Sequence, residues 1–461
     1  MSESSFSSLP LHPSLISNLE SLKFDSMTPI QGLTLPPLLE GKDVIGQAKT
    51  GSGKTAAFGL CLLQKLKVKQ FRVQTLVLCP TRELADQVAR ELRQLGRAIH
   101  NIKILTLYGG TAFGPQVGSL EHGAHIIVGT PGRVEEHLRK KNLDLTNLTS
   151  FVLDEADRML EMGFAPTIDE IIKYLPEKRQ NILFSATFPA EIQKLSNRIM
   201  NNPLNLKIDS THDSSSIQQV LYEVADIEDR NEAIRLLIEE HGASSTLVFC
   251  NMRQQTEDVA KSLVANGYSA KAINGDLEQR DRESRLVQFA NRSLSILVAT
   301  DVAARGLDID SIDLVINFYL SRDVEVHTHR IGRTGRAGGS GLACSLYGSK
   351  ESHKVSELEN LMGIDIPRRP LPNKKLLLKK PGYPPMVTLQ LDAGKKQKIR
   401  PGDILGALTK SGAMLGSAVG KIQISDQSAY IAVSQQEAKN ALHILSNDKV
   451  KGRSFRVRRI K

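Results

Sequence analysis

The chain has 461 residues, of which 40% are hydrophobic and 24% are charged, and its formal net charge is +10. This length exceeds what one hydrophobic core supports, and the composition is that of a globular protein rather than a disordered one. No apolar run approaches the roughly 20 residues of a membrane-spanning helix, and the first residues, MSESSFSSLP, lack a signal-peptide pattern. We therefore expect a soluble, cytoplasmic protein of several domains with no membrane partner.

The cysteine spacing and the charge distribution further limit the class of protein. Cys61, Cys79, Cys250 and Cys344 lie far apart without a CxxC pair, which favours buried thiols over zinc or redox chemistry. Residues 381–461 hold 14 Lys and Arg against 5 Asp and Glu, a charge of +9 for this segment alone. Such a confined basic surplus indicates a polyanion partner, although a solvated basic face would give the same count.

Short apolar runs alternate with amphipathic helical patterns in two successive stretches of the chain. Residues 1–210 contain TLVLCP, HIIVGTP, FVLDEAD and NILFSAT, and residues 215–365 contain TLVFCN, AKAING, SILVATD and LVINFYL. This alternation predicts parallel sheets covered by helices. We therefore predict an α/β fold with two tandem parallel-sheet domains, separated by the polar stretch at 209–216.

The last part of the chain has a different pattern. Residues 366–384, IPRRPLPNKKLLLKKPGYP, are rich in proline and basic residues, which predicts a semi-extended basic linker. In residues 385–461, VTLQL, KIQI, AYIAV and FRVRRI are typical of strands, and QQEAKNALHILSN is typical of an amphipathic helix. We expect a small α+β module here.

A phosphate-binding loop is predicted between the strand-like DVIGQ and a helical pattern. Its sequence is AKTGSGKT, and its glycines allow backbone N–H groups to point toward phosphate oxygens. Lys54 can neutralise the β and γ phosphates, and the Thr55 hydroxyl can bind Mg²⁺. The loop residues are Ala48, Lys49, Thr50, Gly51, Ser52, Gly53, Lys54 and Thr55.

The acidic end of FVLDEAD is the second chemical motif. Ligands of a parallel sheet gather at the carboxyl ends of its strands, so Asp154 is expected to face Lys54 and Thr55. It can hold the Mg²⁺ of a bound ATP through water, while Glu155 orients and deprotonates the attacking water. Alone, a strand that ends in acids is more often a solvated edge, but a neighbouring phosphate loop favours catalysis.

Several motifs occur together in one order: GSGKT, PTRELADQ, TPGR, DEAD, SAT and HRIGRTGR. In this order they resemble those of the DEAD-box ATP-dependent RNA helicases, over residues 6 to about 365. The resemblance implies two RecA-like domains that close on ATP and RNA together, and a short duplex that is opened locally.

The same resemblance assigns nucleotide contacts outside the phosphate loop. Phe24 matches an aromatic that stacks on adenine, with Phe6 as its upstream partner, and Gln31 matches an amide that pairs with the base. Phe6 and Phe24 can also be read as helix-packing residues. Gly306 and Asp308 match a segment that senses nucleotide.

In the second domain, Arg333 and Arg336 match arginines that reach the γ-phosphate when the domains close, where a guanidinium stabilises developing charge. The residues that couple the acidic DEAD motif to closure of the two domains are matched by Asp157, Ser185 and Thr187.

The remaining matches are RNA contacts. They should address phosphates and 2′-hydroxyls, which position a strand without selecting its sequence. Thr81 and Arg133 also have an ordinary reading as a helix cap and a surface residue. The matched residues are Thr81, Arg82, Gly110, Thr130, Arg133, Asn251, Gln279, Arg282 and Thr300.

Three positions depart from the family pattern. Lys49 stands where Gln is usual, Lys23 where Gly usually precedes the aromatic, and His327 where an aromatic is usual. None of them removes a catalytic group, so they bear on nucleotide affinity rather than on chemistry.

Residues 386–461 resemble the RRM-like C-terminal domain of one bacterial branch of this family. The resemblance implies recognition of the peptidyl-transferase-centre hairpin of 23S rRNA, pre-50S particles as partners and a monomeric protein. Phosphate contacts are expected from Lys395, Lys396, Lys398, Arg400, Lys451 and Arg453. Tyr430 is a candidate for base stacking, and a core position is an equal alternative for it.

The sequence thus predicts an RNA-dependent ATPase and helicase that requires ATP and Mg²⁺ and acts in assembly of the large ribosomal subunit. A broad RNA chaperone without a dedicated rRNA target is the nearest alternative. A non-catalytic RNA-binding scaffold and a DNA helicase of the same superfamily are more distant ones.

Overall fold

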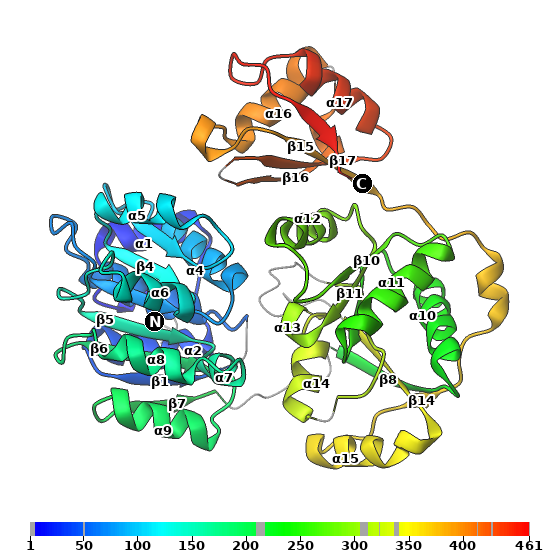
Figure 1. Cartoon of the computed structure of the whole chain (residues 1–461), viewed down its shortest axis with the longest axis horizontal. Helices are drawn as coiled ribbons and strands as arrows, with labels where there is room; N and C mark the ends of the chain where they lie inside the picture. The colour runs from blue at the N-terminus through cyan, green and yellow to red at the C-terminus, as the bar shows by residue number, and fades with distance from the viewer. Residues whose placement is uncertain are drawn as a thin grey trace. The chain divides into compact units, whose positions relative to one another are not determined.

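The computed structural model describes residues 5–48, 51–208, 217–304, 312–321, 323–335, 341–412, 414–425 and 427–460. The chain divides into two compact units, residues 1–211 and 212–461 (Figure 1). The first unit contains one sheet, and the second contains two. The predicted fold class, two parallel α/β domains followed by a small α+β module, is confirmed.

The first unit is built on a seven-stranded sheet with the order β3-β4-β2-β5-β6-β1-β7. Neighbouring strands are parallel, and most are short runs with both faces buried, as expected for a sheet covered by helices. The strands are β1 (Val44–Gln47), β2 (Thr75–Leu78), β3 (Ile104–Leu107), β4 (Ile126–Gly129), β5 (Ser150–Asp154), β6 (Gln180–Ser185) and β7 (Leu204–Lys207).

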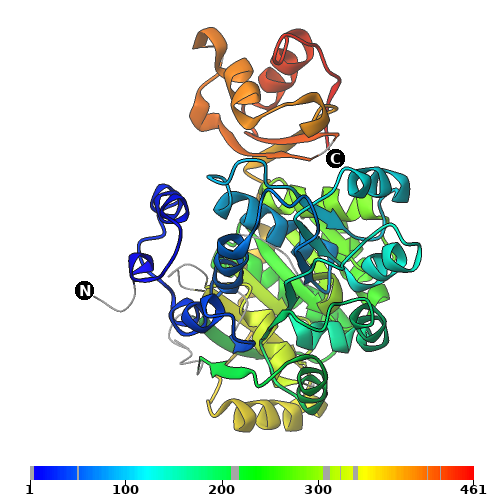
Figure 2. The same cartoon turned by 90° about the vertical axis from the view of Figure 1, so that its left-hand side faces the viewer.

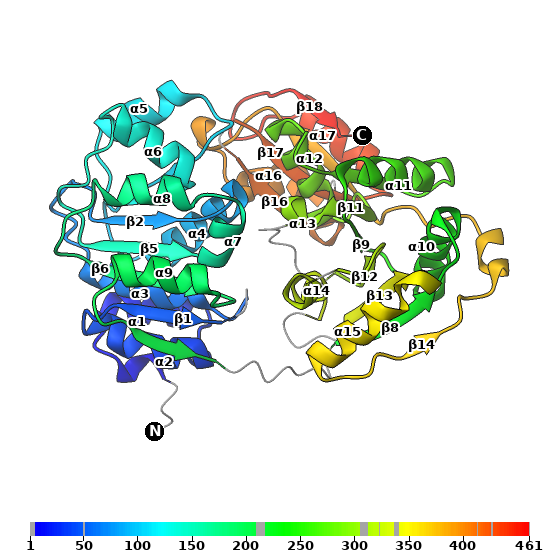
Figure 3. The ribbon, with the colours of Figure 1, turned by 60° about the horizontal axis from the view of Figure 1, so that its bottom comes forward.

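Helices cover both faces of this sheet (Figure 3). Alternate residues of one strand face opposite layers: Val152 packs with the layer of α1 to α4, and Phe151 and Leu153 pack with the layer of α6 to α9. The helices are α1 (Pro13–Ser21), α2 (Pro29–Leu39), α3 (Lys54–Lys65), α4 (Arg82–Leu95), α5 (Phe113–Glu121), α6 (Pro131–Arg139), α7 (Ala156–Glu161), α8 (Ala165–Ile172) and α9 (Ala190–Ile199), preceded by the 3₁₀ turn η1 (Phe6–Ser8).

The second unit repeats this architecture with the strand order β10-β11-β9-β12-β13-β8-β14. Its strands are β8 (Ile217–Glu223), β9 (Thr246–Cys250), β10 (Ala270–Ile273), β11 (Ile296–Thr300), β12 (Leu314–Asn317), β13 (Gly341–Tyr347) and β14 (Arg368–Arg369). Its helices are α10 (Ile227–His241), α11 (Arg253–Ala265), α12 (Gln279–Ala290), α13 (Asp301–Ala304), α14 (Val324–Ile331) and α15 (Ser352–Met362), with the 3₁₀ turns η2 (Ser349–Glu351) and η3 (Lys374–Leu378).

The C-terminal module is the orange and red part of the ribbon in Figure 2. It has a four-stranded antiparallel sheet with the order β16-β17-β15-β18. Leu389 and Ile431 lie on the face that packs against the two helices, so the opposite face carries Thr388 and Tyr430. The elements are β15 (Met386–Leu391), η4 (Lys395–Gln397), α16 (Pro401–Thr409), η5 (Lys410–Gly412), η6 (Gly416–Ala418), β16 (Val419–Ile424), β17 (Ala429–Ser434), α17 (Ala438–Asn447) and β18 (Val457–Arg459).

The basic segment 366–384 is more ordered than a simple spacer. Arg368 and Arg369 form β14, which pairs in parallel with β8 at the edge of the second sheet, and the Leu221 N–H donates to the Pro367 carbonyl. Arg368 also forms an ion pair of 2.8 Å with Glu359. These bonds explain why a polar segment without periodicity becomes a strand.

The four cysteines are free and buried, which confirms their interpretation as buried thiols. Burial raises the pKa of Cys61 to about 11, so this thiol is not activated as a nucleophile. Across the described part of the chain, no helix combines the length and apolar character needed to cross a membrane.

Candidate nucleotide and RNA sites

The candidate site residues of the first unit follow the carboxyl ends of its strands. The loop after β1, the acids after β5 and Ser185 at the end of β6 belong to three adjacent strands. Thr81, Gly110 and Thr130 follow β2, β3 and β4, which are adjacent in the other half of the sheet. The sheet order therefore places the predicted nucleotide contacts in one half of this edge and the predicted RNA contacts in the other. We call these parts the nucleotide half and the RNA half, after the contacts predicted for them.

The phosphate loop has the backbone that its glycines allow. Gly51 and Gly53 have φ of 86° and 91°, in the left-handed region that favours glycine. Gly53 is also crowded, since an added Cβ would fall on the side-chain nitrogen of Gln31. Lys49 and Thr50 lie outside the described residues.

Lys54 and Thr55 open helix α3, where backbone N–H groups favour an anion. The Lys54 side chain is only 6% exposed, and its Nζ donates to the Ala48 carbonyl over 2.9 Å. The ammonium group is therefore held within the loop, where phosphate oxygens can replace the carbonyl as its acceptor.

Asp154 and Glu155 are both buried at the junction of β5 and α7. Burial raises the pKa of Asp154 to about 7, against the opposing charge of Lys54, while Glu155 and Glu91 raise it further. Its Oδ1 atom is buried and has no hydrogen-bond partner among the described residues. This donor set fits a hydrated Mg²⁺, which would supply both the missing partner and the compensating charge.

Asp157 connects the acidic motif to the segment after β6. Its Oδ2 accepts hydrogen bonds from the Ala186 N–H over 3.1 Å, from the Thr187 N–H over 2.9 Å and from the Thr187 hydroxyl over 3.1 Å. The Asp157 N–H donates to the Ser185 hydroxyl over 3.2 Å. The structure thus brings together the three residues that were predicted to couple hydrolysis to closure.

The predicted adenine-reading residues pack beside the phosphate loop. Gln31 is 2% exposed, its Oε1 accepts from the Thr28 N–H over 2.9 Å, and its Nε2 donates to the Gly53 carbonyl over 3.0 Å. Each amide atom retains one further hydrogen-bonding position for a base. Phe24 is half-buried and meets Phe6 edge to face, with ring centroids 6.2 Å apart.

The departures at Lys23 and His327 have distinct structural settings. Lys23 adopts φ of 61°, the left-handed conformation that a glycine takes without strain. His327 is buried, and its Nε2 lies 3.0 Å from Oε1 of Gln219. The left-handed backbone at residue 23 thus explains why glycine suits this position. His327 occupies a buried position in the interior of the second unit.

Arg82 and Arg133 are the cations of the RNA half of the first unit. Arg82 lies against the glycine pair after β3, so that an added Cβ on Gly110 would meet its guanidinium. Arg133 donates to Oε1 of Gln116 over 3.1 Å, and its Nε lies 3.1 Å from Oε2 of Glu136. The Arg133 guanidinium is therefore held in place before any strand binds, and the Arg82 guanidinium lies against Gly110.

Thr81 and Thr130 are the N-cap residues of α4 and α6. The Thr81 hydroxyl accepts from the Leu84 N–H over 3.3 Å, which agrees with its reading as a helix cap. Thr130 has extended backbone and no side-chain cap bond. Both residues lie at the carboxyl edge, so a capping role does not remove them from the predicted RNA site.

In the second unit, Asn251 and Thr300 lie at the carboxyl ends of the adjacent strands β9 and β11, and Gln279 and Arg282 lie in the first turn of α12. Arg282 donates to the Ala303 carbonyl over 3.2 Å. Arg333 is 5% exposed. The other residues assigned to nucleotide chemistry here, Gly306, Asp308 and Arg336, lie outside the described residues.

Arg330 contacts a predicted RNA-binding residue but received no role in the sequence analysis, although it lies inside the HRIGRTGR motif. Its guanidinium contacts both carboxylate oxygens of Asp301, at 2.6 and 2.8 Å, and donates to Oδ1 of Asn251 over 2.8 Å and to the Tyr319 carbonyl over 2.9 Å. It therefore ties an RNA-contact candidate to the segment that begins with Thr300. Arg158, beside Glu155, is a second unassigned residue.

The basic residues that were predicted to contact phosphate in the C-terminal module are all exposed. Lys451 donates to the Lys398 carbonyl over 2.7 Å, which joins the segment after β15 to the turn before β18. The exposed residues are Lys395, Lys396, Lys398, Arg400, Lys451 and Arg453.

Tyr430 is only 9% exposed, and burial raises its pKa, with Glu283 and Arg280 of α12 contributing opposite charge effects. On the same sheet face, the Thr388 hydroxyl lies 2.6 Å from that of Ser293. Tyr430 is therefore covered rather than open, although it lies on the sheet face away from the two helices and outside the hydrophobic core of the module.

Three family models match this chain in succession. Residues 28–195 match the DEAD/DEAH box helicase family, and residues 229–338 match the helicase conserved C-terminal domain. Residues 388–459 match the DbpA RNA binding domain. With the fold and the site geometry, these matches define the class as a DEAD-box ATP-dependent RNA helicase.

Similar proteins show to which branch of the DEAD-box helicases the chain belongs. The ATP-dependent RNA helicase DbpA of Escherichia coli strain K12 is 49% identical to the chain over 98% of both proteins. The DEAD-box ATP-dependent RNA helicase CshA of Bacillus cereus is 43% identical over 77% of this chain and 67% of its own length. The chain belongs to the DbpA family of RNA helicases.

Solved structures agree with the two-domain helicase fold. S. cerevisiae Dbp5 bound to RNA and ADP BeF3 has a TM-score of 0.73 and 29% identity, over 81% of this chain and 99% of that one. Mss116p bound to ssRNA and AMP-PNP has a TM-score of 0.71 and 28% identity, over 79% of this chain and 78% of that one. The tandem sheets are therefore RecA-like helicase domains.

Proposed function

We propose that this ATP-dependent RNA helicase is directed to the peptidyl-transferase-centre hairpin of 23S rRNA and acts in assembly of the large ribosomal subunit. It works as a cytoplasmic monomer on pre-50S particles. The observation that supports this target is the 49% identity to E. coli DbpA along 98% of the chain, together with the DbpA RNA binding domain at residues 388–459.

We assign the nucleotide chemistry to the edge formed by β1, β5 and β6. Lys54 and the N–H groups of its loop bind the β and γ phosphates, and Thr55 and Asp154 hold Mg²⁺, the latter through water. When bound, Mg²⁺ neutralises charge on the phosphate oxygens. Glu155 orients a water molecule and takes its proton as the oxygen attacks the γ-phosphorus, and the bond to the β–γ bridging oxygen breaks to give ADP and phosphate.

Hydrolysis depends on RNA in this proposal because the catalytic set is divided between two domains. Arg333 and Arg336 come from the second domain and reach the γ-phosphate only on closure, when they stabilise the developing charge. Asp157 accepts hydrogen bonds from Thr187 and so couples closure of the two domains to the position of Asp154 and Glu155.

Specificity is assigned to the C-terminal module, because the helicase core offers contacts to phosphate and ribose rather than to base edges. The exposed surface around Lys398 and Lys451 supplies phosphate contacts. Sequence selection by this module rests on the family relationship, since Tyr430 is packed rather than open to a base.

The test is the steady-state ATPase rate of the full-length protein and of a chain that ends at residue 380. Each is measured with 23S rRNA, with a fragment that carries the hairpin and with poly(A). We expect strong stimulation by the hairpin fragment and loss of this preference on truncation. Equal stimulation by all three RNAs would contradict the proposed target and support a broad RNA chaperone. A truncated chain that kept its preference for the hairpin would place specificity in the core.

A further inference from the structure

A basic loop with an exposed aromatic residue connects α3 to β2 in the first helicase domain. Its sequence from residue 65 to 72 is KLKVKQFR, with four cations and no acidic residue. Phe71 is 42% exposed, although large aromatic side chains are ordinarily buried. Neither the nucleotide site nor the RNA half of the carboxyl edge uses this loop.

The loop is held in one conformation by two buried side chains. Gln74 Oε1 accepts from the Lys67 N–H over 2.9 Å, and its Nε2 donates to the Lys67 and Gln70 carbonyls over 2.9 and 2.8 Å. His125 Nδ1 lies 3.0 Å from the Lys103 N–H and must accept from it, so Nε2 carries the proton and donates to the Val68 carbonyl over 3.0 Å. Phe71 is thus presented by a preorganised loop.

Phe71 itself is seated firmly. Its ring lies edge to face against the His125 ring at 4.5 Å between centroids. Beside it, Gly123 leaves room for the ring, since an added Cβ would lie 2.7 Å from Cδ1 of Phe71. These contacts with His125 and Gly123 hold the Phe71 ring in its partly exposed position.

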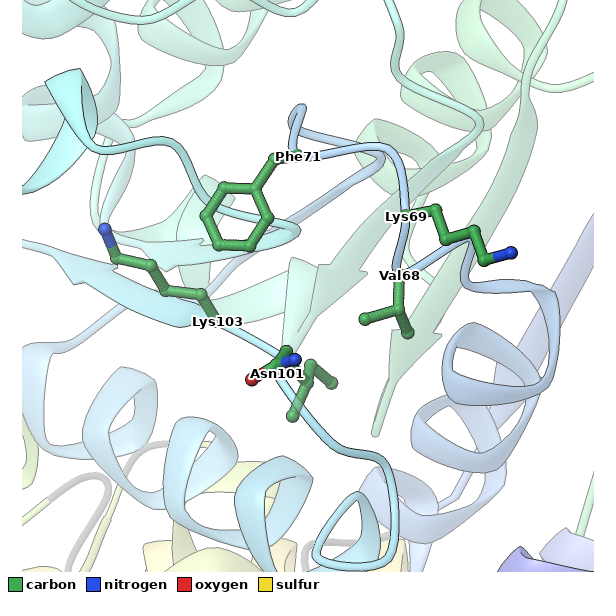
Figure 4. A pocket seen from close by; sticks show the side chains of 6 residues that line it. Val68, Lys69, Phe71, Asn101 and Lys103 are labelled. Atoms are coloured by element: carbon green, nitrogen blue, oxygen red, sulfur yellow. The ribbon is translucent and has the colours of Figure 1, made fainter.

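Phe71 borders a hollow of about 480 Å³ (Figure 4). The side chains of Lys69 and Lys103 lie on either side of the Phe71 ring in this view. Lys69 is exposed, and Lys103 is half-buried with its Nζ on the Ser119 carbonyl at 3.0 Å. None of the six lining residues is acidic: they are Val68, Lys69, Phe71, Asn101, Ile102 and Lys103.

The hollow lies at the opposite edge of the sheet from the catalytic residues. Residues 68–71 precede β2, and residues 101–103 directly precede β3, so both segments are at the amino ends of parallel strands. Lys54, Asp154 and Ser185 are at the carboxyl ends. An RNA strand in the hollow would therefore leave the catalytic edge free.

We propose that this hollow is a second binding site for single-stranded RNA. One base stacks on the exposed face of Phe71, and the flanking phosphates lie beside Lys69 and Lys103. A rigid aromatic platform between cations is what sequence-independent binding of single strands requires. Such a site would let a helicase that acts on a large structured RNA stay bound to a flanking single strand, away from the duplex that it opens.

The first experiment is photocross-linking of the full-length protein to poly(U) that contains 4-thiouridine, with the cross-linked peptides identified by mass spectrometry. The second is fluorescence anisotropy with labelled poly(U) and with an oligouridine too short to reach both edges of the domain. The variants are Phe71→Ala, Phe71→Tyr and Lys69→Glu. Tyr174→Ala is the matched control, because Tyr174 is an exposed aromatic of the same domain whose neighbour Lys173 is paired with Glu170 at 2.6 Å.

We expect cross-links in the peptide that contains Phe71, and an affinity for poly(U) that falls at least about fivefold in Phe71→Ala. Lys69→Glu should also weaken binding, whereas Phe71→Tyr and Tyr174→Ala should bind as the parent does. Stimulation of ATPase by the short oligouridine reports on binding at the carboxyl edge and should not change, which also shows that the variants are folded.

Unchanged affinity of Phe71→Ala for poly(U), with no cross-link near Phe71, overturns the proposal. If Phe71→Ala instead lost binding of a labelled poly-glutamate peptide, the hollow would be a protein-binding surface and the RNA assignment would be wrong.

Discussion

Arg158 and Glu155 form a buried ion pair, with 3.4 Å between Nη1 and Oε2 and side-chain exposures of 3% and 6%. Burying a guanidinium is costly unless a counter-charge accompanies it, so the charge of each side chain compensates that of the other. Glu155 also has φ of 54°, a left-handed backbone that is strained for a residue other than glycine. The proposed general base is thus held by its own backbone and by a cation one turn along α7.

Replacing Arg158 with methionine should lower the kcat of RNA-stimulated ATP hydrolysis by about 10- to 100-fold, because a base displaced by about 1 Å loses alignment with the attacking water. The KM for ATP should change little, since the phosphate loop is intact. Steady-state kinetics with saturating RNA measures both constants, and Arg158→Lys should recover part of the rate.

A double variant separates positioning from general damage to the fold. In a Glu155→Gln background, Arg158→Met should cause almost no further loss of rate, because the group that Arg158 orients is already absent. A large additional loss, or an equal loss of ATP affinity in both backgrounds, would mean that Arg158 stabilises the domain rather than the base.

Substitutions of Lys54 and of Glu155 should affect different steps, ATP binding and ATP hydrolysis. Lys54→Ala should weaken ATP binding because it removes the cation from the loop. Glu155→Gln should keep ATP and RNA bound while kcat falls by about 100-fold or more, because the shape of the side chain survives and the base does not. Nucleotide affinity measured by fluorescence, beside turnover, distinguishes the two, and loss of ATP binding by Glu155→Gln would refute its assigned role.

Arg330 should be a large contributor to stability of the second helicase domain. Arg330→Met leaves the Asp301 carboxylate, which is a quarter exposed, without its bidentate partner, and loss of these charged hydrogen bonds should cost about 1.5–3 kcal/mol. Urea denaturation measures the change. Arg368→Met is the matched control, because its ion pair with Glu359 is half exposed and should contribute less than about 1 kcal/mol. Similar effects of the two substitutions would show that the network around Arg330 is not the cause.

The strand pattern made much of this fold and site predictable. Strands buried on both faces give continuous apolar runs, and the residue after such a run lies at the ligand-binding edge, which is how Asp154 could be placed beside Lys54. The roles of Arg158 and Arg330 could not be read in the same way. A long cation in a sequence is ordinarily a surface residue, and only the three-dimensional packing shows that these two guanidiniums are buried against carboxylates.

Other features were hidden for different physical reasons. Arg368 and Arg369 form a strand through bonds to β8 and not through any periodicity of their own. The internal bonds of Gln31 depend on a loop 22 residues away. In contrast, Phe71 had a visible signal in the sequence, because it lies between Lys69 and Arg72 in a segment that has four cations and no acidic residue.

Gly110 should be required for RNA binding more than for nucleotide binding. Gly110→Ala places a Cβ on the Arg82 guanidinium and on a backbone with φ of 75°, a conformation that costs an L-residue about 1–2 kcal/mol. Affinity for RNA should therefore fall while affinity for ATP stays. Gly114→Ala is the control, because nothing lies within 4 Å of its added Cβ. Equal RNA affinities of the two variants would remove Arg82 and its glycine from the RNA site.

His327 should make the second helicase domain less stable in mild acid. Burial, aided by the charge of Arg330, lowers the pKa of His327 from 6.5 to about 4. The unfolded chain therefore takes up this proton first as pH falls, so the contribution of His327 is complete above about pH 6.5 and is lost progressively toward pH 4. Over that window the loss approaches about 3 kcal/mol.

His327→Gln removes the titrating group and keeps an amide that can donate to Gln219. We expect the free energy of unfolding, measured with urea at several pH values, to fall less steeply between about pH 6.5 and pH 5 in this variant than in the parent, by about 2 kcal/mol at the lower pH. His353→Gln, at an exposed histidine of α15, should leave the slope as it is. Parallel stability curves for the parent and His327→Gln would show that this histidine is not the group whose protonation opposes folding.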